Sequence, residues 1–159
     1  MVDAAIVDIV AMLSGITQWI RSSGQIDGPQ PSPFHDSPFY DVYRCADGGH
    51  ITLGALEPQF YALLMQTLGL SDVDLKQQYD HRTWPVLKER LVTLFAGQPR
   101  AHWEALLERT DVCFAPVLSV QEAAQHPHNV ARGIYQSSET GAMDVAAAPR
   151  FMGLQSRPP

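Results

Sequence analysis

Apolar side chains recur every three or four positions along the first 23 residues, which is the spacing of one face of an α-helix. The positions that share this spacing are Ile6, Ile9, Val10, Leu13, Ile16, Trp19 and Ile20. Gly24 follows as a C-terminal stop, so the pattern predicts one helix over residues 2–23. Apolar residues take up so much of its circumference that two interpretations stay open: a core helix, or a helix buried against a body outside these 159 residues.

Four prolines lie between residues 29 and 38. Each proline fixes φ and lacks a backbone N–H, so this stretch cannot form regular structure and predicts a linker over residues 25–38. Two strand-like runs follow, FYDVYRCA (39–46) and HITLGAL (50–56), joined by Asp-Gly-Gly. Because glycine accepts the backbone of a tight hairpin turn, the two runs predict an antiparallel pair.

Helical and strand-like patterns follow one another after the hairpin. Helices are predicted over residues 58–69, 83–97 and 100–110, with Pro58 and Pro85 in first turns, where the missing N–H needs no partner. A third strand is predicted over residues 111–119. Ser119 and Glu122 have the spacing of a capping box, which indicates a short helix over 120–128, and a further helical turn is expected over 128–133.

Residues 134–159 are less apolar and predict an extended tail with a turn at Gly141. The predicted fold class is therefore α+β, with a small antiparallel sheet of about three main strands covered by helices. A long N-terminal helix and the Pro-rich linker precede it. The predicted organisation is a helical region over 1–24, the linker over 25–38, a small α+β domain over 39–133 and the tail over 134–159.

The composition narrows the class of protein. With 45% hydrophobic and 18% charged residues, the chain resembles a soluble globular protein, and 159 residues suit one domain. The formal net charge is −6 and the 11 Lys and Arg are scattered, so the basic stripe of a nucleic-acid-binding protein is missing. Asp3 and Asp8 interrupt the apolar N-terminal stretch, and no run reaches the ~18 apolar residues of a membrane span. We expect a cytoplasmic protein with no nucleic-acid or membrane partner.

The cysteines and histidines give no metal site. Cys45 and Cys113 lie far apart in strand-like runs, which suits a reducing compartment and predicts two buried, small hydrophobic residues. His126 and His128 flank Pro127 without a third ligand nearby, so a surface turn is favoured over a metal site.

One carboxylate stands at an unusual place. Glu57 lies between an apolar strand-like run and a helix predicted to begin at Pro58. A carboxylate there can accept hydrogen bonds from the N–H groups of the first helical turn, which is a purely structural explanation. The alternative is that the junction presents the carboxylate into a cleft, as an acid–base or orienting group. The motifs by themselves leave both interpretations open.

The series SPFYDVYRCADGGHITLGALEPQFYALL (37–64) and DVCFAPVLSVQEAAQHPHNVARG (111–133) resembles the class III CoA-transferase family, the CaiB/BaiF type. Within that family it is most similar to the branch of α-methylacyl-CoA racemases, and VDAAIVDIV is similar to the segment that leads out of the family's first half. The resemblance covers essentially the whole chain. It implies the exit helix, linker, small domain and returning tail of a chain more than twice as long, with two such chains interlocked as a homodimer.

The resemblance also implies a reaction. In the racemase branch, a histidine and aspartate pair removes and returns the α-proton of an acyl-CoA thioester through an enolate, and no cofactor takes part. Both residues would lie upstream of the position that matches Val2. We therefore expect the C-terminal part of a racemase-like enzyme, inactive alone, whose substrate is an acyl-CoA and whose large domain is supplied by a longer chain or a separate one.

The resemblance assigns three residues. Glu57 matches the glutamate that orients the catalytic histidine of the facing subunit, and Tyr40 and Leu56 match positions on the acyl-chain side of that cleft. The main enzymatic alternative is a formyl-CoA transferase-like fragment, although LEPQFY at the junction lacks the asparagine-aspartate pair often found there. A further alternative is a non-catalytic binding or assembly module, or the relic of a truncated gene.

Overall fold

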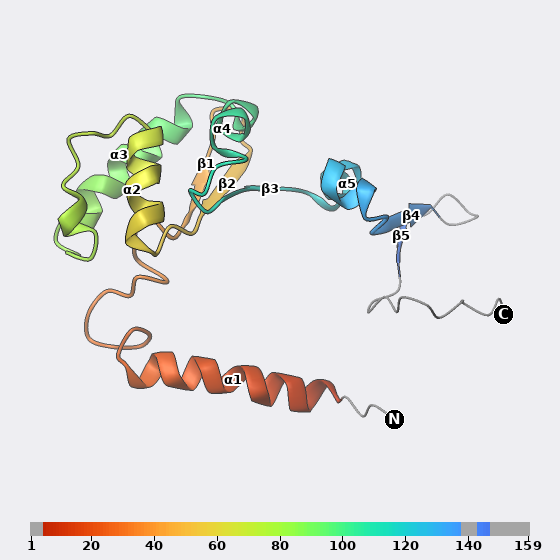
Figure 1. Cartoon of the computed structure of the whole chain (residues 1–159), viewed down its shortest axis with the longest axis horizontal. Coiled ribbons are helices and arrows are strands. Elements are labelled where there is room, and N and C mark those ends of the chain that lie inside the picture. Colours follow the sequence, from red (N-terminus) through yellow and green to blue (C-terminus); the bar gives the residue numbers. More distant parts are fainter. Residues whose placement is uncertain (1–4, 138–142, 147–159) are drawn as a thin grey trace. The chain divides into compact units, whose positions relative to one another are not determined.

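The computed structural model describes residues 5–137 and 143–146, and the chain forms two compact units that divide between Val117 and Leu118. The first unit holds helices and a three-stranded sheet, and the second holds short helices and a two-stranded sheet (Figure 1). The α+β class and the small antiparallel sheet predicted from the sequence are confirmed. The two units are described separately.

Helix α1 (Ile6–Ser22) is the long N-terminal helix that the apolar spacing predicts. It ends where expected, because Gly24 has φ +76°, a conformation that glycine adopts without steric cost. None of its side chains is buried within the described parts of the chain. Ile6 is 81% exposed and Trp19 is 70% exposed, so the helix presents an uncovered apolar surface.

Residues 25–38 contain turns and bends but no helix or strand, as the prolines predict. The second half of this linker is nevertheless ordered by its own hydrogen bonds. The Asp36 carboxylate accepts from the Ser32 N–H at 2.7 Å, and the Ser37 hydroxyl donates to the Pro33 carbonyl at 2.5 Å. Ser32 and Ser37 are buried, so the chain is already packed when it reaches the first strand.

The sheet has the order β1-β2-β3 and is antiparallel throughout, with β1 at Val42–Arg44, β2 at His50–Leu53 and β3 at Phe114–Val117. The Asp-Gly-Gly turn joins β1 to β2, and Gly48 supplies the positive φ of +82° that such a turn needs. Ile51 is paired with Tyr43 on one side and with Pro116 on the other. Proline is tolerated at Pro116 because β3 is an edge strand.

Three helices and one 3₁₀ helix pack with this sheet: α2 (Pro58–Thr67), η1 (Leu75–Gln77), α3 (Trp84–Ala96) and α4 (Arg100–Leu107). Their buried positions recur at helical spacing, as Leu87, Leu91 and Phe95 show in α3. Pro58 and Pro85 occupy first turns, as predicted. The core buries Phe39, Tyr43, Cys45, Ile51, Leu53, Ala55, Tyr61, Leu64, Met65, Trp84, Leu87, Leu91, Phe95, Trp103, Leu107 and Val112.

Aromatic rings join the helices to the sheet. The ring centroids of Tyr43 and Phe95 are 5.0 Å apart, and those of Phe95 and Trp103 are 4.9 Å apart. The Trp103 indole N–H donates to the Phe95 carbonyl at 3.1 Å, which satisfies its polar atom inside the core. On the outer side, Lys88 pairs with Asp41 and lies 4.2 Å from the centroid of the Tyr43 ring. Strand β1 is thus held to α3 and α4 by tilted and edge-to-face ring contacts and by one cation.

The second unit begins with α5 (Val120–Gln125), where Ser119 and Glu122 form the predicted capping box at 3.2 and 2.7 Å. Helix α6 (Pro127–Ala131) follows. In the segment that follows, β4 (Tyr135–Ser137) and β5 (Met143–Val145) pair with each other. Backbone pairing satisfies N–H and C=O groups that a solitary extended tail would leave to water. The turn predicted at Gly141 lies outside the described residues.

Alkaline pH should destabilise this core through Tyr61. Burial, with a smaller contribution from Asp74, raises the pKa of this buried hydroxyl from 10.0 to about 12. The protonated phenol therefore contributes stability that is fully present below pH 10 and lost as the pH rises to about 12, at most about 2–3 kcal/mol. The free energy of unfolding of wild type and of Tyr61→Phe can be measured with urea between pH 10 and about 12. We expect it to fall less with rising pH in the variant than in wild type.

The phenolate absorbance of the folded proteins provides the matched measurement. Subtracting the Tyr61→Phe titration from the wild-type titration should leave one tyrosine that ionises well above its ordinary pKa. Identical urea curves for the two proteins between pH 10 and 12 would contradict this assignment.

Candidate functional site

Four residues, Gly54 to Glu57, connect β2 to α2 and are fixed by backbone hydrogen bonds from two directions. The Gly54 N–H donates to the Cys113 carbonyl at 2.8 Å, and the Ala55 N–H donates to the Phe39 carbonyl at 2.9 Å. The Ala55 side chain is fully buried. The junction therefore extends the sheet's pairing beyond the end of β2 before the helix begins.

A loop 22 and 23 residues further along the chain holds the same junction through side chains. We call residues 78–84 the bracing loop. The Gln78 side-chain amide donates to the Leu56 carbonyl at 2.8 Å and to the Ala55 carbonyl at 3.3 Å. The Tyr79 hydroxyl also donates to the Leu56 carbonyl. Because Gln78 is only 3% exposed, its amide supplies hydrogen bonds where water has little access.

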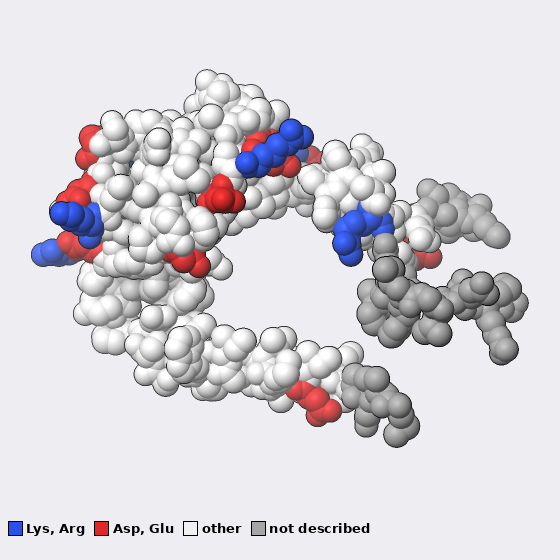
Figure 2. All heavy atoms as spheres, in the orientation of Figure 1, with Lys and Arg blue, Asp and Glu red and all other residues white. Residues whose placement is uncertain are grey.

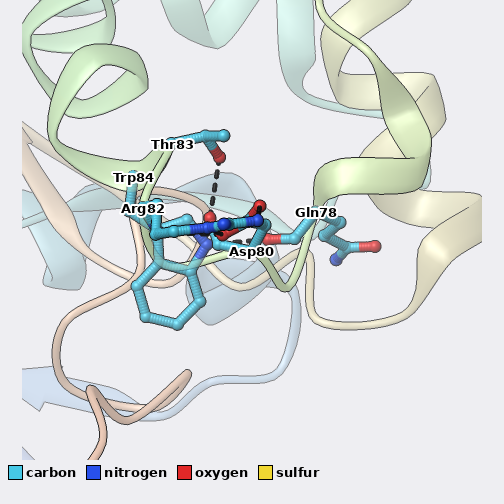
Figure 3. Close-up of polar contacts among 5 residues, drawn as sticks. All are labelled: Gln78, Asp80, Arg82, Thr83 and Trp84. Carbon is cyan, nitrogen blue, oxygen red and sulfur yellow. Dashed lines mark hydrogen bonds and ion pairs between the residues drawn. The ribbon is translucent and has the colours of Figure 1, made fainter.

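The bracing loop is itself fixed by local hydrogen bonds, shown in Figure 3. The Trp84 indole N–H donates to the Gln78 carbonyl at 2.7 Å, and the Thr83 hydroxyl donates to the Asp80 carbonyl at 2.8 Å. The Arg82 guanidinium donates to both carboxylate oxygens of Asp80 at 2.8 and 2.6 Å, which lowers the pKa of Asp80 to about 2. The carbonyls of Gln78 and Asp80 and the Asp80 carboxylate thus each have a neighbour that sets their direction.

One buried ring joins the loop to the linker and to α2. The Phe39 ring meets Tyr61, Tyr79 and Trp84 in edge-to-face contacts, with centroid separations of 5.3, 5.8 and 5.8 Å. Phe39 is completely buried. The junction, the loop and the helix that follows therefore share one packing centre.

Glu57 occupies the N-cap position of α2, but its side chain does not cap the helix. Its backbone carbonyl accepts from Phe60 and Tyr61, both at 3.0 Å, which starts the helix. The carboxylate makes no capping hydrogen bond, so the structure does not show the side-chain capping that the first interpretation expects. The residue is exposed, and its charge is available to groups other than the helix.

The Glu57 charge acts on two neighbouring groups. Burial raises the pKa of the Tyr79 hydroxyl, and the negative charge of Glu57 raises it further. Burial also raises the pKa of the Cys113 thiol, and Glu57 and then Asp111 add to that effect. Like charges disfavour ionisation, so the negative charge of Glu57 opposes ionisation of both the phenol and the thiol.

A cavity of about 520 Å³ opens beside Cys113 and belongs entirely to the first unit. Its lining includes Tyr40, Gly54 and Cys113, together with Phe34, His35, Asp41, Val42, Thr52, Leu53, Phe114 and Ala115. An added Cβ at Gly54 would lie 3.7 Å from the Tyr40 ring and 3.7 Å from the Cys113 Cβ, so the cavity wall is closely packed at this point. The volume lies within the range of small-molecule sites.

The structure separates the two residues assigned to the acyl-chain side. Tyr40 is 39% exposed, lines the cavity and meets the Phe34 ring edge-on at 5.9 Å. Leu56 is half-buried, packs against the core and is not among the residues that line the cavity. Its backbone carbonyl, and not its side chain, is the part of Leu56 that the bracing loop holds.

Cys113 is exposed, so the prediction that both cysteines are buried is wrong for this residue and right for Cys45. The reason is that β3 begins one residue later, at Phe114, and Cys113 has φ +54°. Non-glycine residues rarely adopt this backbone conformation, which is most frequent where the surroundings impose it. The reversal turns the thiol out of the strand pattern and onto the cavity wall.

Sequence reasoning missed Gln78, Tyr79 and Cys113. The segment QQYDHRTW has no apolar periodicity, so nothing in it predicts that a glutamine is buried or that a tyrosine hydroxyl reaches back to residue 56. The one local signal is the Trp84-Pro85 pair, which begins α3 and therefore marks where the loop ends.

Charged side chains of the described residues form several separate ion pairs. On the face that Figure 2 shows, Lys and Arg lie in small groups beside acidic side chains, and α1 is almost free of charge. Within residues 5–137 and 143–146, no group of three His, Cys, Asp or Glu is arranged to hold a metal ion. Among these same residues, no helix has both the length and the apolar character needed to cross a membrane.

Comparison with known proteins identifies the family of this chain. The family model described as CoA-transferase family III matches residues 1–159. Alpha-methylacyl-CoA racemase of Homo sapiens is 34% identical over 159 residues, which are 99% of this chain and 42% of the human protein. The Mus musculus racemase is also 34% identical and is matched over 41% of its length. The chain therefore spans less than half the length of these relatives.

Solved structures support the same fold. Two crystal structures of Rv3272 from Mycobacterium tuberculosis are each 17% identical to this chain, with TM-scores of 0.64 and 0.63. Each covers 94% of this chain, whereas the chain covers 40% and 41% of them. At this identity the likeness concerns the fold alone. The match to the family model over residues 1–159 is what carries the assignment: the chain belongs to CoA-transferase family III.

Proposed function

We propose that this chain is the C-terminal part of an α-methylacyl-CoA racemase-like enzyme and that it supplies an orienting carboxylate to the reaction. The observation that carries the proposal is the state of Glu57. Its carboxylate is exposed, makes no capping bond, and stands on a junction fixed by the sheet and by the bracing loop. The 34% identity to two racemases supports the choice of this branch.

The proposed reaction moves one proton. A base removes the α-proton of a 2-methylacyl-CoA thioester, the electron pair of the C–H bond moves into an enolate, and an acid on the other face returns a proton to the same carbon. The thioester makes the α-proton acidic enough for protein groups to remove, and no cofactor is needed. The histidine and aspartate that act as base and acid are assigned to a segment outside these 159 residues.

Glu57 would act on the histidine and not on the substrate. A carboxylate that accepts from one imidazole nitrogen fixes the tautomer and the ring direction, so the other nitrogen faces the substrate carbon. The negative charge also favours the protonated imidazole, which helps the histidine to serve as the acid for one enantiomer. Glu57 suits this role because the hydrogen-bonding capacity of its carboxylate is not used to cap α2.

Two other features fit an incomplete enzyme. The apolar surface of α1, with Trp19 at 70% exposure, suits burial against a large domain supplied by an interlocked second copy or by a separate chain. The cavity beside Tyr40 has a mostly apolar and aromatic lining that also includes His35, Asp41 and Thr52, and its volume of about 520 Å³ suits part of an acyl chain.

The chain alone should give no exchange of the α-proton of a 2-methylacyl-CoA with deuterium oxide, measured by mass spectrometry. Exchange should appear when the chain is fused behind the part of human α-methylacyl-CoA racemase that it does not match, because the fusion brings the acid–base pair to Glu57. Exchange by the isolated chain would contradict the proposal. A folded, monodisperse fusion without exchange would contradict it equally.

In the active fusion, Glu57→Gln should lower kcat by about tenfold or more, because an amide does not favour the protonated imidazole. The limb of the pH–rate profile that reports the histidine should move to lower pH for the same reason. Glu89→Gln removes an exposed carboxylate from α3 and serves as the matched control, with kcat and the pH profile expected to stay at the wild-type values. Equal effects of the two substitutions on kcat and on the pH profile would contradict an orienting role for Glu57.

Transfer of CoA between carboxylic acids is the second candidate. The family model carries that activity in its description, and a CaiB/baiF CoA-transferase family protein of Caenorhabditis elegans is 24% identical over 141 residues. A transferase needs an acceptor carboxylate, whereas a racemase does not. Formation of a new thioester only when an acceptor acid is added, without deuterium at the α-carbon, would favour the transferase.

A further inference from the structure

We propose that Tyr79 is a positioning residue for Glu57, so that its hydroxyl fixes the direction in which the carboxylate leaves the junction. The inference rests on the proposed function for its catalytic meaning. Its structural content can be tested on the 159-residue chain itself.

The contact acts on the peptide bond next to Glu57. The Tyr79 hydroxyl donates to the Leu56 carbonyl, which belongs to the peptide group that joins Leu56 to Glu57. A planar peptide group turns as one body, so a hydrogen bond to its carbonyl also fixes the N–H and the Cα of Glu57. The Leu56 carbonyl has no role in a strand ladder or in a helix. Its direction is therefore set by the bracing loop.

Two donors share this carbonyl and approach from different depths. Gln78 donates from a position that is 3% exposed, and Tyr79 donates from one that is 50% exposed. A carbonyl oxygen has two lone pairs, so the two bonds together saturate it and leave it little freedom to rotate. Gln78 holds the junction to the core, and Tyr79 holds the side that faces solvent and Glu57.

The ring of Tyr79 is anchored independently of its hydroxyl. It meets Phe39 edge-on, with ring centroids 5.8 Å apart and an interplanar angle of 86°. The backbone before it is held by the hydrogen bond from the Trp84 indole to the Gln78 carbonyl. Tyr79→Phe therefore keeps the ring contact and removes only the bond to Leu56.

Cys113 is a built-in reporter of the Glu57 carboxylate. Partial desolvation raises the pKa of this thiol, and the charge of Glu57 raises it further. Cys113 is exposed while Cys45 is buried, so iodoacetamide reacts selectively with Cys113 under native conditions. The pH dependence of the alkylation rate then measures how close the carboxylate stays to the thiol.

Glu57→Gln should shift the alkylation midpoint of Cys113 to lower pH, because one like charge is lost. Tyr79→Phe should shift it in the same direction by a smaller amount, because the released carboxylate spends more time away from the thiol. The double variant should match Glu57→Gln alone, since removing the hydroxyl can act on Cys113 only through the carboxylate.

Tyr61→Phe is the matched control, because it removes a hydroxyl from the neighbouring helix without touching Leu56. It should leave the midpoint unchanged, and circular dichroism should show that all four variants keep the wild-type fold. A wild-type midpoint for Tyr79→Phe would overturn the proposal. An equal shift from Tyr79→Phe with or without Glu57→Gln would overturn it too, because the effect would then bypass the carboxylate.

Turnover in the active fusion separates this proposal from the proposed function. Tyr79→Phe should lower kcat with little change in KM, and it should cause no further loss in the Glu57→Gln background. If Glu57→Gln leaves turnover intact, the racemase role of Glu57 fails while the alkylation result still decides whether Tyr79 positions it. If Glu57→Gln impairs turnover but Tyr79→Phe changes neither kcat nor the alkylation midpoint, only the positioning role fails.

Discussion

The carbonyl of Leu56 is the point on which the candidate site depends. It lies outside the sheet and the helix that flank it, and it is satisfied by a buried amide and a phenol from the bracing loop. An unpaired carbonyl at a half-buried position would cost free energy and would leave the turn into α2 undefined. Cys113 and Phe39 hold the backbone of the two residues that precede Leu56, and the Trp84 indole holds the backbone of Gln78.

The elements that the sequence predicts well are those governed by local physics. Helical spacing, the two prolines in first turns, the Asp-Gly-Gly hairpin and the Ser119–Glu122 capping box all involve neighbours a few residues apart, and all are present. The family resemblance was likewise readable, since its motifs lie in order along the chain. Glu57 could be singled out because a charge between two apolar runs needs a reason.

The remaining features of the site depend on distant contacts or on one unusual backbone angle. Gln78 and Tyr79 reach back 22 and 23 residues to Leu56, and no local pattern in the loop encodes that distance. Cys113 lies in an apolar run, so its pattern predicts burial, and only the positive φ reverses the side chain. The sequence also predicts that Glu57 precedes the first turn of α2. It does not predict that the side chain makes no capping hydrogen bond, because that depends on the side-chain conformation in the folded chain. Tertiary context therefore decides which groups are available for chemistry.

The bracing loop has a consequence for how the protein responds to heat. Its contacts to the junction are side-chain hydrogen bonds at the edge of the core, and half of the Tyr79 surface is in water. Such a segment opens locally at a smaller free energy than global unfolding requires, whereas Leu91 and Phe95 stay packed until the whole unit melts. The alignment of Glu57 would then fade at temperatures where the circular dichroism spectrum is still native, so the working range of this site is narrower than the folded range of the protein that carries it.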